Sequence, residues 1–372
     1  MVVVFLVISS IVVIIYLALS LLLAANLAAN KTKACPHFPF VSVVVAARNE
    51  ARFLPACLSS LVDLDYPKER LEIVIVNDDS QDTSEEIIRQ FASTSPVIKY
   101  VNLASHQKKR PGKEGAILSG INSSRGEMIF ITDADCRVPC SWIKTLLSAM
   151  APDVGIVGGF TLLDRRGDST SIWGKIQSLD WLFLLSMACA AARMGKPLSW
   201  VGNNLAFRRD AYDEVGGYLG IDSSLVEDFS LINAIRRKTA WRIVFSTSPG
   251  AIISSYPEKT LKQFYFQRRR WATGVSKILT FGKILMGTTI AAHATIFAVA
   301  LLHGVSLAVG FGAILLLADL FFLSRALAIF CRKDLFLYFL GFEAIYFLYT
   351  LVLPVLSLFD RNIRWKDNYH SN

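Results

Sequence analysis

The chain has 372 residues, of which 53% are hydrophobic, and its mean hydropathy is +0.43. This is too apolar for an ordinary soluble protein of this length and indicates membrane-embedded segments. The net charge is +9, and the basic residues flank apolar segments instead of alternating with aromatic residues on a polar face. This distribution argues against nucleic acid as a partner and fits a domain that lies against anionic lipid headgroups.

Residues 1–29 form an almost uninterrupted apolar run, long enough to cross the ~30 Å hydrocarbon core as a helix. A secretory signal peptide is the alternative, because the Ala-rich residues 24–29 resemble a cleavage site. However, the run is longer than a usual signal core and no basic segment precedes it. We therefore expect an uncleaved anchor. Lys31 and Lys33 follow directly, so the positive-inside tendency predicts an integral protein of the cell (inner) membrane with a cytoplasmic globular domain.

Strands and helices alternate after this anchor. Apolar, partly β-branched runs predict strands at 41–47, 71–77, 97–103 and 128–132, with helices between them at 54–62, 84–91 and 113–122. Such alternation is typical of an α/β fold with a parallel, doubly wound sheet. In these sheets, ligands bind beyond the carboxyl ends of the strands.

Polar side chains follow three of these four strands directly. In chain order they are Arg48, Asn49 and Glu50, then Asp78, Asp79 and Ser80, then Asp133 and Asp135. Each cluster alone could be loop or helix-cap chemistry, but all three should converge on one edge of the sheet. Two carboxylates one residue apart repel each other, which favours a hard cation such as Mn²⁺ or Mg²⁺, shared with a phosphate, between them.

The second half of the domain is less regular. We expect a strand at 155–161, an apolar helix at 173–194 in the membrane interface, a strand at 199–207 and a helix at 226–237. Glu227 and Asp228 lie in the first turn of that last helix, where the helix dipole also favours acids. Of the six cysteines, Cys136 and Cys140 alone are closely spaced, and reduced bystanders are favoured over a zinc site.

The C-terminal part is basic and then apolar. A helix at 261–279 carries three consecutive arginines before Trp271, which could be an interfacial anchor. Residues 284–323 are long enough for two spans broken near Gly304, and 335–359 for a third. The expected organisation is an anchor at 1–29, a cytoplasmic domain at 38–280, two to three transmembrane helices at 284–359 and a basic tail at 360–372. Three spans would place the basic tail outside, so the orientation of the C-terminus stays open.

The motifs Asp78-Asp79-Ser80, Asp133-Ala134-Asp135, Glu227-Asp228 and Gln267-x-x-Arg270-Trp271, in this order and spacing, resemble those of the inverting family 2 glycosyltransferases of GT-A fold. The resemblance covers about residues 41–271. It is strongest to membrane-bound ceramide glucosyltransferase-like and small polysaccharide-synthase-like members. It implies a doubly wound GT-A domain between transmembrane helices that moves a hexose from a nucleotide sugar, a UDP-sugar, to a lipid or lipid-linked acceptor.

The resemblance also implies a role for each matching residue. The donor would be bound by Ala46, Arg48, Glu50, Asp78, Asp79, Lys113, Asp133, Gln267, Arg270 and Trp271. Asp133 and Asp135 would hold the divalent metal, and the acceptor would lie against Gly202, Asn203, Asn204 and Trp271. Asp228 would be the catalytic base that takes the proton from the attacking hydroxyl, while the metal and an arginine stabilise the departing diphosphate.

Two other functions are compatible with this pattern. A processive polysaccharide synthase would need more spans to line a channel than this chain offers. A non-catalytic membrane scaffold or transporter that merely binds nucleotide would not need Asp135, Asp228 and Trp271 together. A single-addition lipid glycosyltransferase is therefore the favoured hypothesis.

Overall fold

The computed structural model describes residues 2–29, 37–163, 171–198, 202–223, 227–273, 280–359, 362–365 and 368–371. Two structural units can be distinguished, and each is described by itself. The sheet unit comprises Ala29–Arg165 and Ser199–Tyr256, and the helical unit comprises Met1–Ala28, Arg166–Leu198 and Pro257–Asn372.

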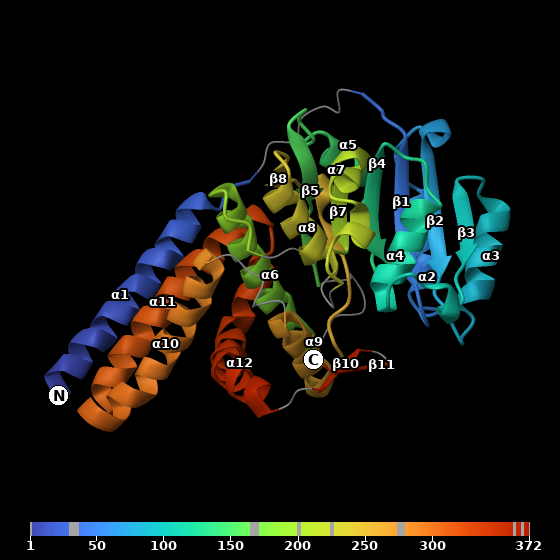
Figure 1. The fold of residues 1–372 in the computed structure, drawn as a ribbon. Coiled ribbons are helices and arrows are strands. Elements are labelled where there is room, and N and C mark those ends of the chain that lie inside the picture. The colour runs from blue at the N-terminus through green and yellow to red at the C-terminus, as the bar shows by residue number, and fades with distance from the viewer. Residues whose placement is uncertain are drawn as a thin grey trace. The chain divides into compact units, whose positions relative to one another are not determined.

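A seven-stranded sheet with the order β3-β2-β1-β4-β7-β5-β8 forms the centre of the sheet unit (Figure 1). Its strands are β1 (Val41–Ala47), β2 (Leu71–Asn77), β3 (Ile98–Asn102), β4 (Met128–Asp133), β5 (Val154–Gly158), β7 (Asn204–Arg208) and β8 (Arg242–Phe245). A small second sheet pairs β6 (Thr161–Leu162) with β9 (Ile253–Ser254). The helices of this unit are α2 (Leu54–Val62), α3 (Ser84–Thr94), α4 (Gly112–Asn122), α5 (Trp142–Leu147), α7 (Arg209–Glu214) and α8 (Glu227–Lys238). Short 3₁₀ turns lie at Lys68–Arg70, Ser105–Gln107, Gly217–Gly220 and Pro249–Ala251.

The expected α/β fold is confirmed, but the sheet is mixed. Strands β3, β2, β1 and β4 are parallel, whereas β7 runs antiparallel to both of its neighbours, β4 and β5. The sequence pattern could not reveal this, because the apolar periodicity of a strand is the same in either direction. The reversal places Asn204, the first residue of β7, beside Thr132 near the carboxyl end of β4.

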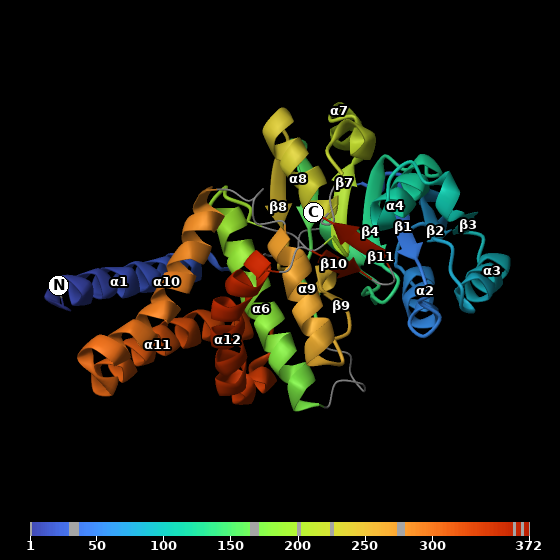
Figure 2. The same cartoon turned by 60° about the horizontal axis from the view of Figure 1, so that its bottom comes forward.

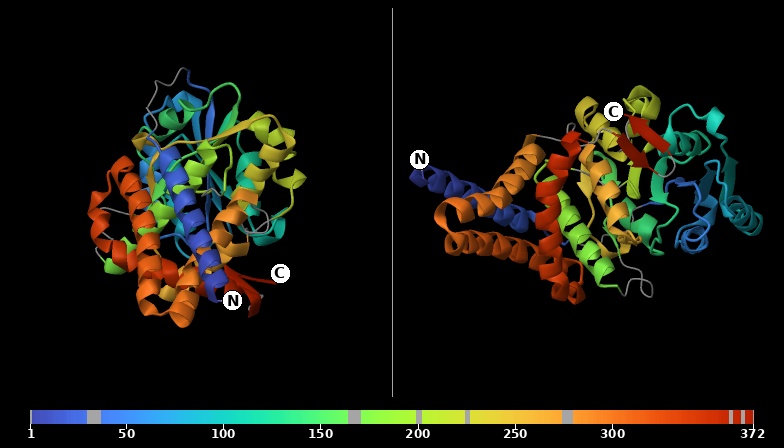
Figure 3. Two further views of the ribbon diagram at one scale, coloured as in Figure 1. Left: turned by 90° about the vertical axis from the view of Figure 1, so that its left-hand side faces the viewer. Right: turned by 90° about the horizontal axis from the view of Figure 1, so that it is seen from below.

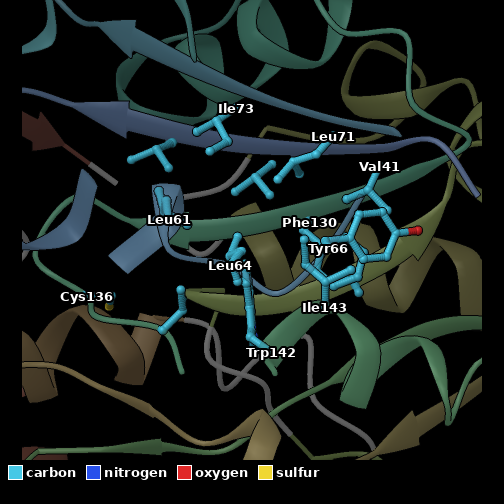
Figure 4. Packing of buried hydrophobic residues seen from close by; sticks show 14 of the residues in the cluster. Val41, Leu61, Leu64, Tyr66, Leu71, Ile73, Phe130, Cys136, Trp142 and Ile143 are labelled. Carbon is cyan, nitrogen blue, oxygen red and sulfur yellow. The ribbon is translucent and has the colours of Figure 1, made fainter. Parts of the chain in front are cut away.

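Both faces of the sheet are covered. On one face, Phe130 of β4 packs with Leu61 of α2 and Trp142 of α5 (Figure 4). On the other face α4 lies against β1 and β2, and Gly120 permits this close approach because a Cβ there would lie 3.1 Å from Cγ2 of Val76. Burial on both faces explains why these strands are mostly apolar and why acidic side chains gather after their carboxyl ends.

The helical unit contains α1 (Val2–Asn26), α6 (Ile172–Arg193), α9 (Leu261–Thr273), α10 (Thr280–His303), α11 (Val305–Ile329), a 3₁₀ helix at Lys333–Tyr338 and α12 (Phe339–Phe359). A hairpin of β10 (Asn362–Trp365) and β11 (Asn368–Ser371) follows (Figure 2). The helices α1, α10 and α11 lie side by side (Figures 1 and 3). Gly304 separates α10 from α11 with φ +95°, a value that glycine readily adopts, so the predicted break is confirmed.

Four described helices are long and apolar enough to cross a membrane: Val2–Asn26, Thr280–His303, Val305–Ile329 and Lys333–Leu356. One precedes and three follow the sheet unit in the sequence, so the C-terminal part offers three candidate spans. Helix α6, expected in the membrane interface, is not one of the four. The helix expected at 261–279 is described to Thr273, and residues 274–279 lie outside the described part.

Candidate functional site

The loops after β1 and β2 are joined to each other. The backbone N–H of Asn49 donates to Ser80 Oγ at 3.1 Å, and Asn49 Oδ1 accepts from the backbone N–H of Gln81 at 2.8 Å. Asn49 and Asp79 adopt left-handed φ values of 55° and 57°, which Asn and Asp tolerate better than most residues. The carboxyl ends of these two strands therefore form one connected edge, where the sequence predicted a nucleotide.

The two predicted nucleotide-binding acids of the second loop differ in their surroundings. Asp78 is buried and forms an ion pair with Lys108, whereas Asp79 is half-buried and its Oδ2 accepts from Ser105 Oγ at 2.6 Å. Sequence reasoning missed Lys108. The signal was present, since a buried carboxylate requires a cation and a basic run begins at Lys108, but the partner could not be chosen from the pattern.

Three carboxylates crowd at the ends of β1 and β4. Ala46 lies beside Asp133 in the strand register, and Glu50 follows in the next loop. Burial and the charges of Asp133 and Glu50 raise the pKa of Asp135 to about 6. Asp135 Oδ2 also accepts from Ser255 Oγ at 3.1 Å, a contact that the sequence did not predict. A cation bound here would relieve the repulsion that raises this pKa.

These residues fit a divalent cation that is shared with a substrate. No group of three or more His, Cys, Asp or Glu side chains is arranged around a common point in the described ranges. Mg²⁺ and Mn²⁺ do not need such a cage, because one or two carboxylates with phosphate oxygens and water suffice. Asp133 and Asp135 are the two carboxylates here that could supply such a pair, and their role as metal ligands stays a prediction.

Lys113, in the first turn of α4, connects this acidic edge to α8. Its Nζ lies 2.5 Å from Asp133 Oδ1 and 3.3 Å from Glu227 Oε1. Burial lowers the pKa of Lys113, but the charges of Asp133 and Glu227 outweigh burial and raise the pKa overall. The ammonium group is therefore charged at physiological pH, beside the carboxylate expected to hold the metal.

Glu227 and Asp228 have different environments, as expected for adjacent residues on a helix. Glu227 is buried and points to the cation Lys113, whereas Asp228 is half-buried and its Oδ1 accepts from the backbone N–H of Phe229 at 2.7 Å. Gly202 lies against Asp228: a Cβ at Gly202 would be 2.6 Å from both Cβ and Oδ2 of Asp228. The turn before β7 therefore borders the carboxylate expected to act as the base.

A side chain at Gly202 should displace that carboxylate. The substitution adds one methyl group at this close contact, so its effect would be steric. We expect Gly202→Ala to lower the sugar-transfer rate by on the order of 10²-fold, the cost of a misplacement of about 1 Å. Gly287→Ala is the control, because a Cβ at Gly287 meets no atom within 4 Å. Equal rates for both variants would contradict the close packing of Gly202 on Asp228.

The two asparagines after Gly202 serve the fold. Asn203 Oδ1 accepts from Thr161 Oγ1 at 2.8 Å. Asn204 has no exposed surface: its Oδ1 accepts from Trp142 Nε1 at 2.9 Å, and its Nδ2 donates to the carbonyl oxygens of Phe160 and Ala251. The side chain of Asn204 thus supports the turn through hydrogen bonds within the protein, and its predicted acceptor role stays a prediction.

Arg48 directly follows β1, and three further predicted residues belong to α9 in the helical unit. Gln267 Nε2 donates to Glu258 Oε1 at 3.0 Å, and the ring of Trp271 lies 4.9 Å from that of Trp181. Arg270 is half-buried, and its charge opposes the rise in the pKa of Glu258 that burial causes. The structure brings these three residues together along α9.

Comparison with known proteins identifies the family. The model of the family described as Glycosyl transferase family 21 matches residues 3–371.

The chain is 29% identical over 241 residues to the probable glycosyltransferase YdaM of Bacillus subtilis, and the match covers 64% of this chain and 56% of that protein. It is 30% identical over 243 residues to an N-acetylglucosaminyltransferase of Rhizobium meliloti, covering 63% and 55%. It is 26% identical over 240 residues to a beta-monoglucosyldiacylglycerol synthase of Synechocystis, covering 64% and 48%. The chain thus spans about half the length of these curated relatives.

A solved structure shows the same fold. The mannosyltransferase PcManGT from Pyrobaculum calidifontis, in complex with GDP-Man and Mn²⁺, superposes with a TM-score of 0.60 at 20% identity, over 96% of this chain and 99% of that one. This neighbour supports the predicted GT-A architecture. The motif resemblance to family 2 is refined by the family model, which matches over almost the whole sequence. The chain belongs to glycosyl transferase family 21.

Proposed function

We propose that this protein is a membrane-bound inverting glycosyltransferase that moves a hexose from a nucleotide sugar to a lipid or lipid-linked acceptor. One observation carries the proposal. Lys113 bridges Asp133, at the end of β4, to Glu227, and Asp228 follows Glu227 at the start of α8. Lys113, which would bind the diphosphate, therefore connects the proposed metal ligand Asp133 to the helix turn that carries the proposed base Asp228.

The donor side would use the acidic edge of the sheet. Asp133 and Asp135 would hold Mn²⁺ or Mg²⁺, which when bound supplies charge stabilisation for the departing diphosphate. Arg48, Glu50 and Asp79 would contact the nucleoside. Ala46 and the Lys108-paired Asp78 would shape its pocket. Lys113 would then turn from Asp133 toward the diphosphate.

The acceptor side would use Asp228. Its carboxylate would accept the proton of the acceptor hydroxyl as the oxygen attacks the anomeric carbon from the face opposite the diphosphate, which inverts the configuration. Gly202 leaves the space in which this carboxylate sits. Gln267, Arg270 and Trp271 would close over the diphosphate and the acceptor, with Arg270 offsetting the growing negative charge.

The acceptor class is argued from the membrane helices. The four candidate spans of the described residues would keep the protein at a bilayer, where lipid hydroxyls are abundant. A relative named beta-monoglucosyldiacylglycerol synthase supports a glycolipid product. A UDP-sugar donor is proposed from the motif resemblance. A ceramide glucosyltransferase-like activity is a finer form of the same proposal. We further propose an inner-membrane location with the sheet unit in the cytoplasm, where nucleotide sugars are made.

A processive polysaccharide synthase is the second candidate. A relative from Staphylococcus epidermidis, 26% identical, is named poly-beta-1,6-N-acetyl-D-glucosamine synthase. Single addition remains the favoured form of the proposal, because a polymer channel would need to be lined by more spans than the four candidates in the described part of the chain.

The test is transfer of label. Membranes containing the protein are incubated with a panel of radiolabelled UDP- and GDP-sugars, and the lipid extract is separated by thin-layer chromatography. We expect one labelled lipid that carries a single sugar. Label in a polymer that stays out of the lipid phase would favour the synthase. No incorporation with any donor, while the nucleotide still binds, would favour a non-catalytic scaffold.

A further inference from the structure

A buried ion pair joins three helices of the helical unit. Arg268 of α9 pairs with Asp180 of α6, and their side chains are only 3% and 1% exposed. The hydroxyl of Tyr349, on α12, donates to the other carboxylate oxygen of Asp180 at 2.6 Å. Tyr349 lies within the candidate span Lys333–Leu356, so one carboxylate connects α9 to a segment that is long and apolar enough to cross a membrane.

Arg268 also packs against Trp271. The guanidinium carbon lies 4.2 Å from the centre of the Trp271 ring system and 4.4 Å from that of Phe264. Trp271 is in turn 4.9 Å from the ring of Trp181, a neighbour of Asp180 on α6. Trp271 therefore has a cation and an aromatic ring as neighbours, and the cation is held by Asp180.

A second branch of contacts reaches Gln267. Arg268 Nη1 donates to Gln267 Oε1 at 3.1 Å, which leaves the Gln267 amide group to donate to Glu258 Oε1 at 3.0 Å. The backbone of Glu258 is held by Gln177 of α6, whose Oε1 accepts from its N–H at 2.9 Å. Arg268 therefore contacts both Gln267 and Trp271.

Stability alone does not explain this arrangement. A buried ion pair is weak evidence for stability, because desolvation of both charges offsets their attraction and apolar residues often replace such a pair at little cost. A guanidinium with planar, directed N–H groups does, however, fix its neighbours in orientation. Arg268 is also one of the two unspecified positions within Gln267-x-x-Arg270-Trp271.

We propose that Arg268, Asp180 and Tyr349 form a positioning network that sets the orientation of Gln267 and Trp271. The inference rests on the proposed function, in which those two residues close over the diphosphate and the acceptor. None of the three network residues is assigned a contact with substrate. Their effect should therefore be on the rate of transfer, with little effect on donor binding.

The test combines kinetics with a spectroscopic readout of Trp271. Three variants are made: Asp180→Asn, Tyr349→Phe and the double variant Asp180→Asn, Arg268→Gln. The double variant leaves no unpaired buried charge, so it keeps a folded protein available if Asp180→Asn alone is unstable. Asp153→Asn is the matched control, because it breaks an Arg–Asp pair at 2.7 Å that is exposed on the sheet unit. Each protein is labelled with 5-fluorotryptophan, and the Trp271 resonance in the ¹⁹F spectrum is assigned through Trp271→Phe.

We expect kcat to fall by about 10- to 100-fold in Asp180→Asn and the double variant, with KM for the donor within about two-fold of wild type. Tyr349→Phe, which loses one hydrogen bond, should lower kcat by about three- to ten-fold. The Trp271 resonance should move in all three variants and stay in place in Asp153→Asn. A folded double variant with wild-type kcat, or an unmoved Trp271 resonance in Tyr349→Phe, would overturn the network. If wild-type protein transfers no sugar at all, the proposed function fails, and the ¹⁹F shifts still decide whether the network positions Trp271.

Discussion

Asp135→Ala is expected to remove sugar transfer almost completely, and wild-type activity should require Mn²⁺ or Mg²⁺. Asp135 lies at the ligand edge of the sheet, where burial and the negative charges of Asp133 and Glu50 raise its pKa. A divalent ion bound between these acids would contribute several kcal/mol to the transition state, so its loss should cost on the order of 10³-fold or more in rate. The measurement is a titration of activity with Mn²⁺ after removal of metal by EDTA.

Two additional variants make this test specific. Ser255→Ala removes the hydroxyl that orients Asp135 but keeps both carboxylates. It should weaken Mn²⁺ binding, measured by calorimetry, by about 10- to 100-fold, as expected for a group that orients a metal ligand. Asp153→Asn changes an exposed carboxylate on the same unit and should be silent. Full turnover in excess EDTA would show that the acidic edge does not act through a metal.

Asp228→Asn is expected to cost on the order of 10² to 10⁴ in transfer rate, the contribution of a positioned general base. Asparagine keeps the size of the side chain and its place against Gly202, but it cannot take up the proton of the attacking hydroxyl. Donor affinity should survive, because Lys113 and the Asp133–Asp135 pair are unchanged. Nucleotide-sugar affinity by calorimetry and transfer to lipid by label, both in detergent, measure the two quantities separately.

Glu227→Gln is the matched variant, because the neighbouring carboxylate has a different partner. Its loss leaves Lys113 with Asp133 as its remaining ion-pair partner, so we expect the main change in donor KM and a smaller one in kcat. If Glu227→Gln is inactive while Asp228→Asn transfers sugar at a near-normal rate, the base is misassigned by one residue. If both variants stay active, base catalysis by α8 is wrong.

The sequence by itself determined the features that depend on neighbouring residues. Mostly apolar runs located β1 and β2 at their observed bounds, because strands covered on both faces have few polar positions inside them. Asp133 and Asp135 could be located in the same way, because they directly follow the apolar residues of β4. Chain length and composition likewise located the apolar helices, since crossing ~30 Å of hydrocarbon requires about 20 apolar residues.

Tertiary structure decided what depends on residues far apart in the chain. The direction of β7 brought Gly202 to Asp228, and periodicity carries no information on strand direction. The partners of Asp78 and Lys113 were likewise open until the fold chose among many nearby charges. Arg268 read as part of an interfacial basic run, yet it is buried on Asp180, 88 positions earlier in the chain. The partner of a buried charge has to be close in space but not in sequence. The neighbouring residues in the sequence therefore do not indicate which partner it will have.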